Sequence, residues 1–192
     1  MRTKTLLLLL FCSTLAGAQT YVRPSANADP GSTVGNAACF NGVAAGASYT
    51  TGSPAMTAVY SGKTGVGPTG SSATITAVTN NTYRPRRFTG LSGTYAYETL
   101  NVSMACSNTQ NHCEIPYSVD GGSTWHTLAY VPGGTSQATY SATLPSSTNL
   151  TNLQVAVCAE KQTGNVTLTT YDIWVTGLTS PPAAQRILSG SM

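Results

Sequence analysis

Charged residues are scarce in this chain. They make up 8% of its 192 residues, against roughly a quarter in an average soluble domain. Nine Lys and Arg residues oppose six Asp and Glu residues, and two of the nine, Arg2 and Lys4, lie in a segment that we expect to be removed. The remaining seven against six give a net charge of about +1, too small for a protein that binds nucleic acid by neutralising phosphates. Because 41% of the residues are hydrophobic, the chain also lacks the composition of a disordered protein.

Long apolar runs are absent after the first 18 residues, so we expect no membrane span in the mature chain. The N-terminus has the order of a secretory signal peptide: a basic start, an apolar run over residues 6–11, and Ala16-Gly17-Ala18 before the cleavage point. This order predicts a signal peptide over residues 1–18, a mature chain that begins at Gln19, and a secreted protein, extracellular or held in the periplasm or at the outer surface. Cys12 follows Phe11 rather than a small residue, which argues against a lipoprotein.

Removal of the signal peptide leaves four of the five cysteines, an even number that permits two disulfides in any of three connectivities. The strands that end at Cys106 and begin at Cys113 are expected to form a hairpin, which would bring the two Cα atoms within disulfide distance. Cys39 and Cys158 would then pair by elimination. The spacing of Cys106 and Cys113 is too wide for a zinc knuckle, so no metal site and no cofactor is predicted; a structural calcium ion is left open.

Alternating apolar and polar residues indicate strands over residues 100–104 and 113–119. Further strands are predicted over 57–60, 72–78, 124–131, 137–144, 153–160 and 165–175, the last with a bulge between Leu168 and Tyr171. No helical periodicity separates them. We therefore expect an all-β protein, an antiparallel jelly-roll-like β-sandwich in a single domain over residues 19–177, followed by a flexible tail over 178–192.

Residues 118–125 read Ser-Val-Asp-Gly-Gly-Ser-Thr-Trp and resemble the Asp-box of sialidase-like propellers and of other secreted β-proteins. Asp120 can accept hydrogen bonds from turn amides, Gly122 can adopt a positive φ, and Trp125 can cover the base of the hairpin. The resemblance implies a structural turn rather than an active site. A propeller itself is excluded because the chain is too short for six blades and carries a single box.

A broader resemblance extends over residues 100–177. Taken together, residues 117–125, 153–157 and 171–175, the last reading Tyr-Asp-Ile-Trp-Val, are similar to the C-terminal half of bacterial secreted jelly-roll sandwiches of the galactose-binding-like type. This resemblance implies a β-sandwich and, at the level of the family, glycan binding.

Residues 83–88 combine two aromatic residues with three of the seven mature basic residues around a proline. Tyr83 is predicted to stack on a sugar ring, while Arg84 and Arg87 bond hydroxyl or acid groups. The alternative interpretation is a solvated approach to a strand edge, in which the proline and the charges prevent aggregation.

Catalysis has few candidate residues. The six acids and two histidines show no pairing of nucleophile, base and orienting group, and Asp120, which shares a strand face with Glu114, is assigned to a turn. The sequence predicts a non-catalytic secreted protein that binds extracellular carbohydrate. Two alternatives stay open: a structural or adhesive subunit that associates with itself, because few charges guard its surface, and a small secreted hydrolase.

Overall fold

We describe the chain from a computed structural model over residues 19–29, 39, 48–49, 55–64, 67–68, 70–77, 82–109, 112–161 and 163–178. The predicted signal peptide and all but the first residue of the predicted tail lie outside these ranges. The strands are β1 (Gln19–Val22), β2 (Ala26–Ala28), β3 (Ser48–Tyr49), β4 (Ala73–Ala77), β5 (Thr82–Thr89), β6 (Tyr97–Cys106), β7 (His112–Ser118), β8 (His126–Pro132), β9 (Thr135–Thr143), β10 (Gln154–Lys161) and β11 (Val166–Leu178).

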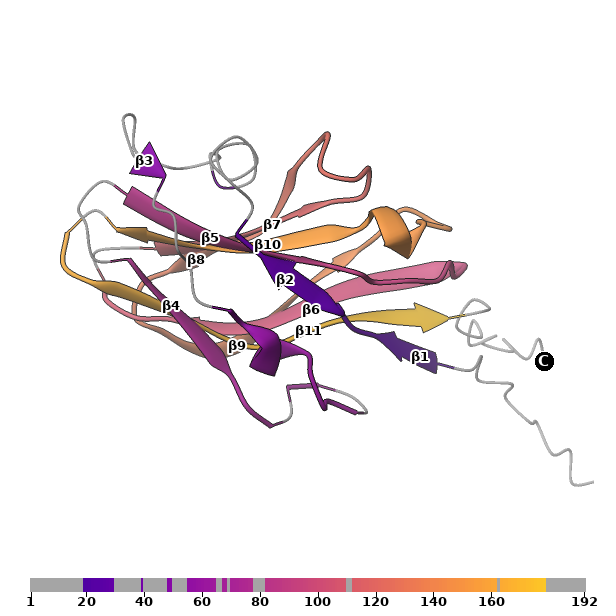
Figure 1. Cartoon of the computed structure of the whole chain (residues 1–192), viewed down its shortest axis with the longest axis horizontal. Coiled ribbons are helices and arrows are strands. Elements are labelled where there is room, and N and C mark those ends of the chain that lie inside the picture. Colours follow the sequence, from indigo (N-terminus) through magenta and orange to yellow (C-terminus); the bar gives the residue numbers. More distant parts are fainter. Residues whose placement is uncertain are drawn as a thin grey trace, which may run out of the picture.

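These strands form two sheets that pack face to face (Figure 1). Sheet A has the order β1-β11-β6-β9, with β4 also paired to β11, and sheet B has the order β2-β5-β10-β7-β8, with β3 also paired to β5. From β4 to β11 the chain crosses to the other sheet at every step except between β7 and β8. This is the jelly-roll arrangement of eight strands, so the predicted all-β sandwich is confirmed.

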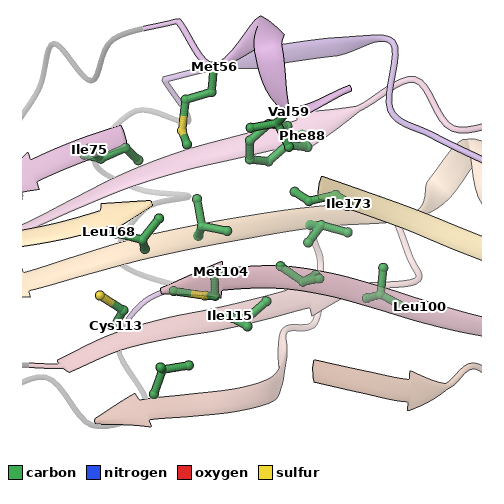
Figure 2. Packing of buried hydrophobic residues seen from close by; sticks show 14 of the residues in the cluster. Met56, Val59, Ile75, Phe88, Leu100, Met104, Cys113, Ile115, Leu168 and Ile173 are labelled. Carbon is green, nitrogen blue, oxygen red and sulfur yellow. The ribbon is translucent and has the colours of Figure 1, made fainter. Parts of the chain in front are cut away.

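The hydrophobic core lies between the two sheets (Figure 2). Sheet A contributes Ile75, Leu100, Met104, Leu168 and Ile173, and sheet B contributes Phe88 and Ile115, all without exposed surface. Each such side chain contributes about 1.5–3 kcal/mol by leaving water. The core thus explains the alternation that the sequence shows from residue 100 onward, and the predicted bulge is present as a register shift between Thr170 and Asp172.

The predicted hairpin between residues 100–106 and 113–119 is wrong. Strand β6 belongs to sheet A and β7 to sheet B, so the chain between them crosses the edge of the sandwich. The Cys106–Cys113 disulfide nevertheless forms, with its Cα atoms 6.0 Å apart, and Cys39 pairs with Cys158. Both predicted disulfides are confirmed, although the first one joins two sheets.

The predicted strand over residues 57–60 is also wrong. Residues Thr57–Val59 form the 3-10 helix η1, closed by hydrogen bonds from the amides of Tyr60 and Ser61 to the Thr57 carbonyl at 3.2 and 2.9 Å. Val59 enters the core from this turn. A run of four residues is too short for its period to separate a strand from a turn of helix.

Strand β5 is the largest element that the sequence analysis did not predict. It lies inside sheet B, paired with β10 along its length, although Pro85 cannot donate a backbone hydrogen bond. On the other side of β5, β3 pairs with residues 82–83 and β2 with residues 87–89. Pro85 therefore falls in the gap between these two short strands, where no described strand requires its amide.

Among the residues that the structure describes, no helix is long and apolar enough to cross a membrane.

An ion pair strengthens the edge of sheet A. Arg23 donates to both carboxylate oxygens of the buried Asp172, at 3.0 Å each. Such a two-pronged pair holds the chain after β1 against β11.

Candidate functional site

The Asp-box segment forms the turn that joins β7 to β8. Ser118 is fully buried; its hydroxyl donates to Asp120 Oδ1 at 2.7 Å and accepts the Gly122 amide at 2.8 Å. Asp120 accepts the Thr124 amide at 2.9 Å, and these hydrogen bonds lower the pKa of its carboxyl to about 2. The Trp125 indole donates to the Gly122 carbonyl at 3.1 Å. The side chains of Ser118, Asp120 and Trp125 thus form their hydrogen bonds inside the turn, which is the geometry expected of a folding element.

Tyr83 does not lie where the sequence analysis expected it. Its ring has no exposed surface and packs on the outer side of sheet B with Ala156 and the Cys39–Cys158 disulfide. Half-buried Trp125 packs against the same cluster, and burial raises the pKa of the Tyr83 phenol. The predicted stacking of Tyr83 on a sugar is therefore wrong for this structure.

The predicted partners of Tyr83 lie on opposite faces of β5. Arg84 turns toward β4, where it donates to the Thr76 carbonyl at 2.8 Å. Arg87 is half-buried on the face that carries Tyr83, and it reaches Gln154 Oε1 at 3.4 Å. Because neighbouring residues of a strand point to opposite faces, Tyr83 and Arg87 share a face and Arg84 cannot join them. The three residues do not form one site, and binding by Arg87 stays a prediction.

A cluster of polar side chains crosses the outer face of sheet B near its β8 edge. We call His112, Glu114, Thr127, Tyr130 and Glu160 the outer-face cluster. The imidazole Nε2 of His112 contacts both the Glu160 carboxylate and the Tyr130 hydroxyl. The Tyr130 ring lies against the imidazole at a tilt of 31°, with centroids 4.1 Å apart. Thr127 donates to Glu114 Oε1 at 2.8 Å.

Burial and like charge govern the chemistry of this cluster. Glu114 is 3% exposed, and the loss of hydration, together with the nearby Glu160 carboxylate, raises its pKa to about 7. Burial and the same two carboxylates raise the pKa of Tyr130 to about 12. The carboxylates stand on neighbouring strands of one sheet, each with a partner, whereas a glycosidase pair faces a substrate across a cleft. Burial and like charge thus favour the protonated form of Glu114.

The structure has a groove of about 370 Å³ at the end of sheet A opposite β1. It lies where β6 ends, β9 begins and β11 begins. Its lining residues are small or polar, and none is charged: Ala105, Cys106, Ser107, Asn108, Gly134, Thr135, Ser136, Thr167 and Thr169. Thr167 and Thr169 point to the outer face because they alternate with buried Val166 and Leu168. We call this hollow the hydroxyl groove.

Hydrogen bonds between neighbouring segments hold the walls of the hydroxyl groove in place. Ser107 and Thr167 exchange two of them: the Thr167 amide donates to Ser107 Oγ at 2.8 Å, and the Ser107 amide donates to the Thr167 carbonyl at 3.0 Å. Gly134 has a φ of +80°, and a Cβ there would lie 2.8 Å from the Thr109 methyl group. A disulfide ties Cys106, one of the lining residues, to Cys113. None of the hydrogen bonds found among the described residues uses the hydroxyl of Ser136 or Thr169.

No sequence pattern predicts the outer-face cluster or the hydroxyl groove. His112 and Glu160 are 48 residues apart, and only the pairing of β7 with β10 brings them opposite each other. The groove likewise collects three segments that no local pattern connects. The feature of the sequence that could have pointed to the groove is the density of Ser, Thr and Asn near the ends of these strands.

No protein-family model and no curated protein sequence matches the chain. One similar solved structure is that of the CBM22-1 and GH10 modules of the Clostridium thermocellum endo-1,4-beta-D-xylanase 10B, complexed with xylohexaose. It is 15% identical, with a TM-score of 0.35, and the match covers 52% of this chain and 20% of that one. Similarity at this level assigns the chain to no family. The sandwich itself is established by its own strand order.

Proposed function

We propose that the chain is a secreted, non-catalytic β-sandwich protein that binds a neutral carbohydrate in the hydroxyl groove. The observation that carries this proposal is the lining of the groove. Six of its nine residues have a hydroxyl or amide side chain, and none has a charge. Sugar hydroxyls both donate and accept hydrogen bonds, as Ser and Thr hydroxyls and Asn amides do.

The size and rigidity of the groove support the same ligand class. Its volume of about 370 Å³ falls in the lower part of the range for small-molecule sites, enough for one or two sugar units. The walls are tied by backbone hydrogen bonds between β6 and β11 and by a disulfide. A rigid site loses little entropy when it orders a ligand.

A glycan array probed with the purified protein tests the proposal, followed by calorimetric titration of the strongest neutral hit. Thr169→Val keeps the shape of the side chain but removes its hydroxyl, and we expect it to weaken binding about tenfold, since a hydrogen bond contributes about 1 kcal/mol or more. Thr74→Val, on β4 of the same sheet and outside the groove, is the matched control and should bind as the unsubstituted protein does.

Arg87→Ala tests the other candidate site, the one that the sequence predicts, while the groove stays intact. Arg87 lies on the outer face of sheet B, away from the groove in sheet A, so its loss should leave the affinity unchanged. Weaker binding by Arg87→Ala together with normal binding by Thr169→Val would reject the groove. An array without any bound glycan would reject carbohydrate binding altogether.

A further inference from the structure

The free edge of sheet A is a strand without the usual protection. Strand β9 ends the sheet, and no described strand pairs with its outer side. Edge strands are normally guarded by charged residues, by proline or by short length. Over its nine residues β9 reads Thr-Ser-Gln-Ala-Thr-Tyr-Ser-Ala-Thr, with no charge and no proline. Alternate backbone amide and carbonyl groups of this strand therefore point outward, where another strand can bind them.

The sequence of β9 is nearly symmetric about Tyr140. On either side of Tyr140 stand Thr139 and Ser141, then Ala138 and Ala142. The register shift of β9 against β6 lies before Ala138, so residues 138–143 pair regularly with β6. In an antiparallel pair of two copies centred on Tyr140, Thr139 would face Ser141 and Ala138 would face Ala142. Each polar residue then meets a polar one and each apolar residue an apolar one.

The interior of the sandwich is also incompletely covered along this side. Tyr140 on β9 and Leu128 and Ala129 on β8 pack against the core but are only partly buried. Both β8 and β9 are edge strands, joined directly through Gly133-Gly134. The partly exposed apolar side chains therefore line the same side of the molecule as the free edge of β9.

We propose that a second copy of this chain pairs with β9, antiparallel and about a two-fold axis through Tyr140. The pairing extends sheet A across the two copies, places the two Tyr140 rings together at the axis, and covers the partly buried rim. The low charge of the chain leaves little repulsion between copies. Because such an axis stands perpendicular to the sheet, both hydroxyl grooves would open on one continuous face. This arrangement adds to the proposed carbohydrate binding and does not depend on it.

Two double variants test the proposal. Thr139 and Ser141 are exposed, so long charged side chains fit there without disturbing the core. In T139K/S141K, each new lysine faces a lysine of the other copy, and like charges in directly opposed positions destabilise strand pairs. In T139K/S141E, each lysine faces a glutamate. Both variants lose the Ser141 hydrogen bond to Asn101, so that loss does not distinguish them. They differ at residue 141 alone, and hence in the sign of the charge that the pairing brings against the new lysine at position 139.

Sedimentation velocity without ligand, over about 1 µM to 1 mM protein, gives the readout. We expect the unsubstituted chain to dimerise, T139K/S141K to raise the dissociation constant at least tenfold, and T139K/S141E to restore dimers. Thr74→Lys, on the opposite edge strand β4, is the matched control and should dimerise normally. Equal melting temperatures of the two double variants would show that a difference between their dimer dissociation constants does not come from a loss of folding.

Three results would overturn the proposal. A monomeric unsubstituted chain over the whole concentration range would reject the pairing. Loss of dimers in T139K/S141E as well as in T139K/S141K, with both folded, would reject the axis through Tyr140. Loss of dimers in Thr74→Lys with normal dimers in T139K/S141K would assign the contact to another edge. None of these measurements involves a glycan, so the dimer proposal and the carbohydrate proposal can each fail without affecting the other.

Discussion

Cys106 closes a strand of sheet A and Cys113 lies at the start of a strand of sheet B, so the disulfide between them ties the two layers of the sandwich together. Its loop contains only six residues between the cysteines, and Cys106 is one of the residues that line the hydroxyl groove. The bond therefore couples the stability of the fold to the shape of the groove.

Replacement of both cysteines, C106S/C113S, should lower the free energy of unfolding by about 2–3 kcal/mol, the value for closing a short loop. Denaturant unfolding measures the loss. C39S/C158S, which opens a loop with a sequence separation of 119, should cost more, about 4–5 kcal/mol. If the two variants lost equal stability, loop entropy would not be the main contribution of these bonds.

The Asp-box turn should act on stability. Ser118→Ala leaves the partly buried Gly122 amide without its acceptor, so we expect a loss of about 1–3 kcal/mol in denaturant unfolding. Asp120→Ala should lower the melting temperature too, because the Thr124 amide loses its acceptor. Ser123→Ala, whose hydroxyl is exposed and bonds only the Asp120 carbonyl, is the control. Normal melting of Ser118→Ala with altered glycan binding would make the box a functional element.

Glu114 should make stability depend on pH between about 4.5 and 7. Its pKa is raised from 4.5 to about 7 in the folded protein, so the native state holds this proton more tightly than the unfolded state does. The resulting stabilisation is complete below pH 4.5 and is lost as the pH rises through about 7, with an upper limit of about 3 kcal/mol. Glu114→Gln, which imitates the protonated acid, should flatten that part of the curve of melting temperature against pH. An unchanged curve would contradict the buried state of Glu114.

Tyr83 should prove structural. Tyr83→Ala empties a fully buried site and should lower the free energy of unfolding by about 3–5 kcal/mol, whereas Tyr83→Phe keeps the ring and should cost no more than about 1–2 kcal/mol. Thermal melts of both variants measure the difference. A Tyr83→Ala protein that melts normally but binds glycan weakly would restore the ligand contact that the sequence suggested.

Export should remove residues 1–18. Intact mass of protein from the culture medium or periplasm should correspond to a chain that begins at Gln19, because the basic, apolar and Ala-x-Ala order marks that cleavage point. Mutation of Ala18 to Arg should block cleavage and serves as the control. A retained or lipidated N-terminus in the unsubstituted protein would contradict the prediction.

Much of this protein was readable from the sequence alone. The strands from β6 to β11 were predicted because apolar and polar residues alternate along them. In β6 the side chains of Leu100, Val102 and Met104 all point into the core, and such a face imposes a period of two. The bulge near Tyr171 was visible as a break in that period. Turn chemistry identified the turn over residues 118–125, because Ser118, Asp120 and Gly122 form hydrogen bonds within a few residues of one another.

Only the tertiary structure decided how those strands are distributed between the sheets. A period of two is the same for two strands of one hairpin and for two strands in facing sheets, so β6 and β7 could not be separated by pattern. It also decided that Tyr83 is covered, that Arg84 and Arg87 point apart, and that His112 meets Glu160 across two strands distant in sequence. The hydroxyl groove and the free edge of β9 arise from the same cause: each depends on which strands end beside one another, and local physical chemistry does not encode that order.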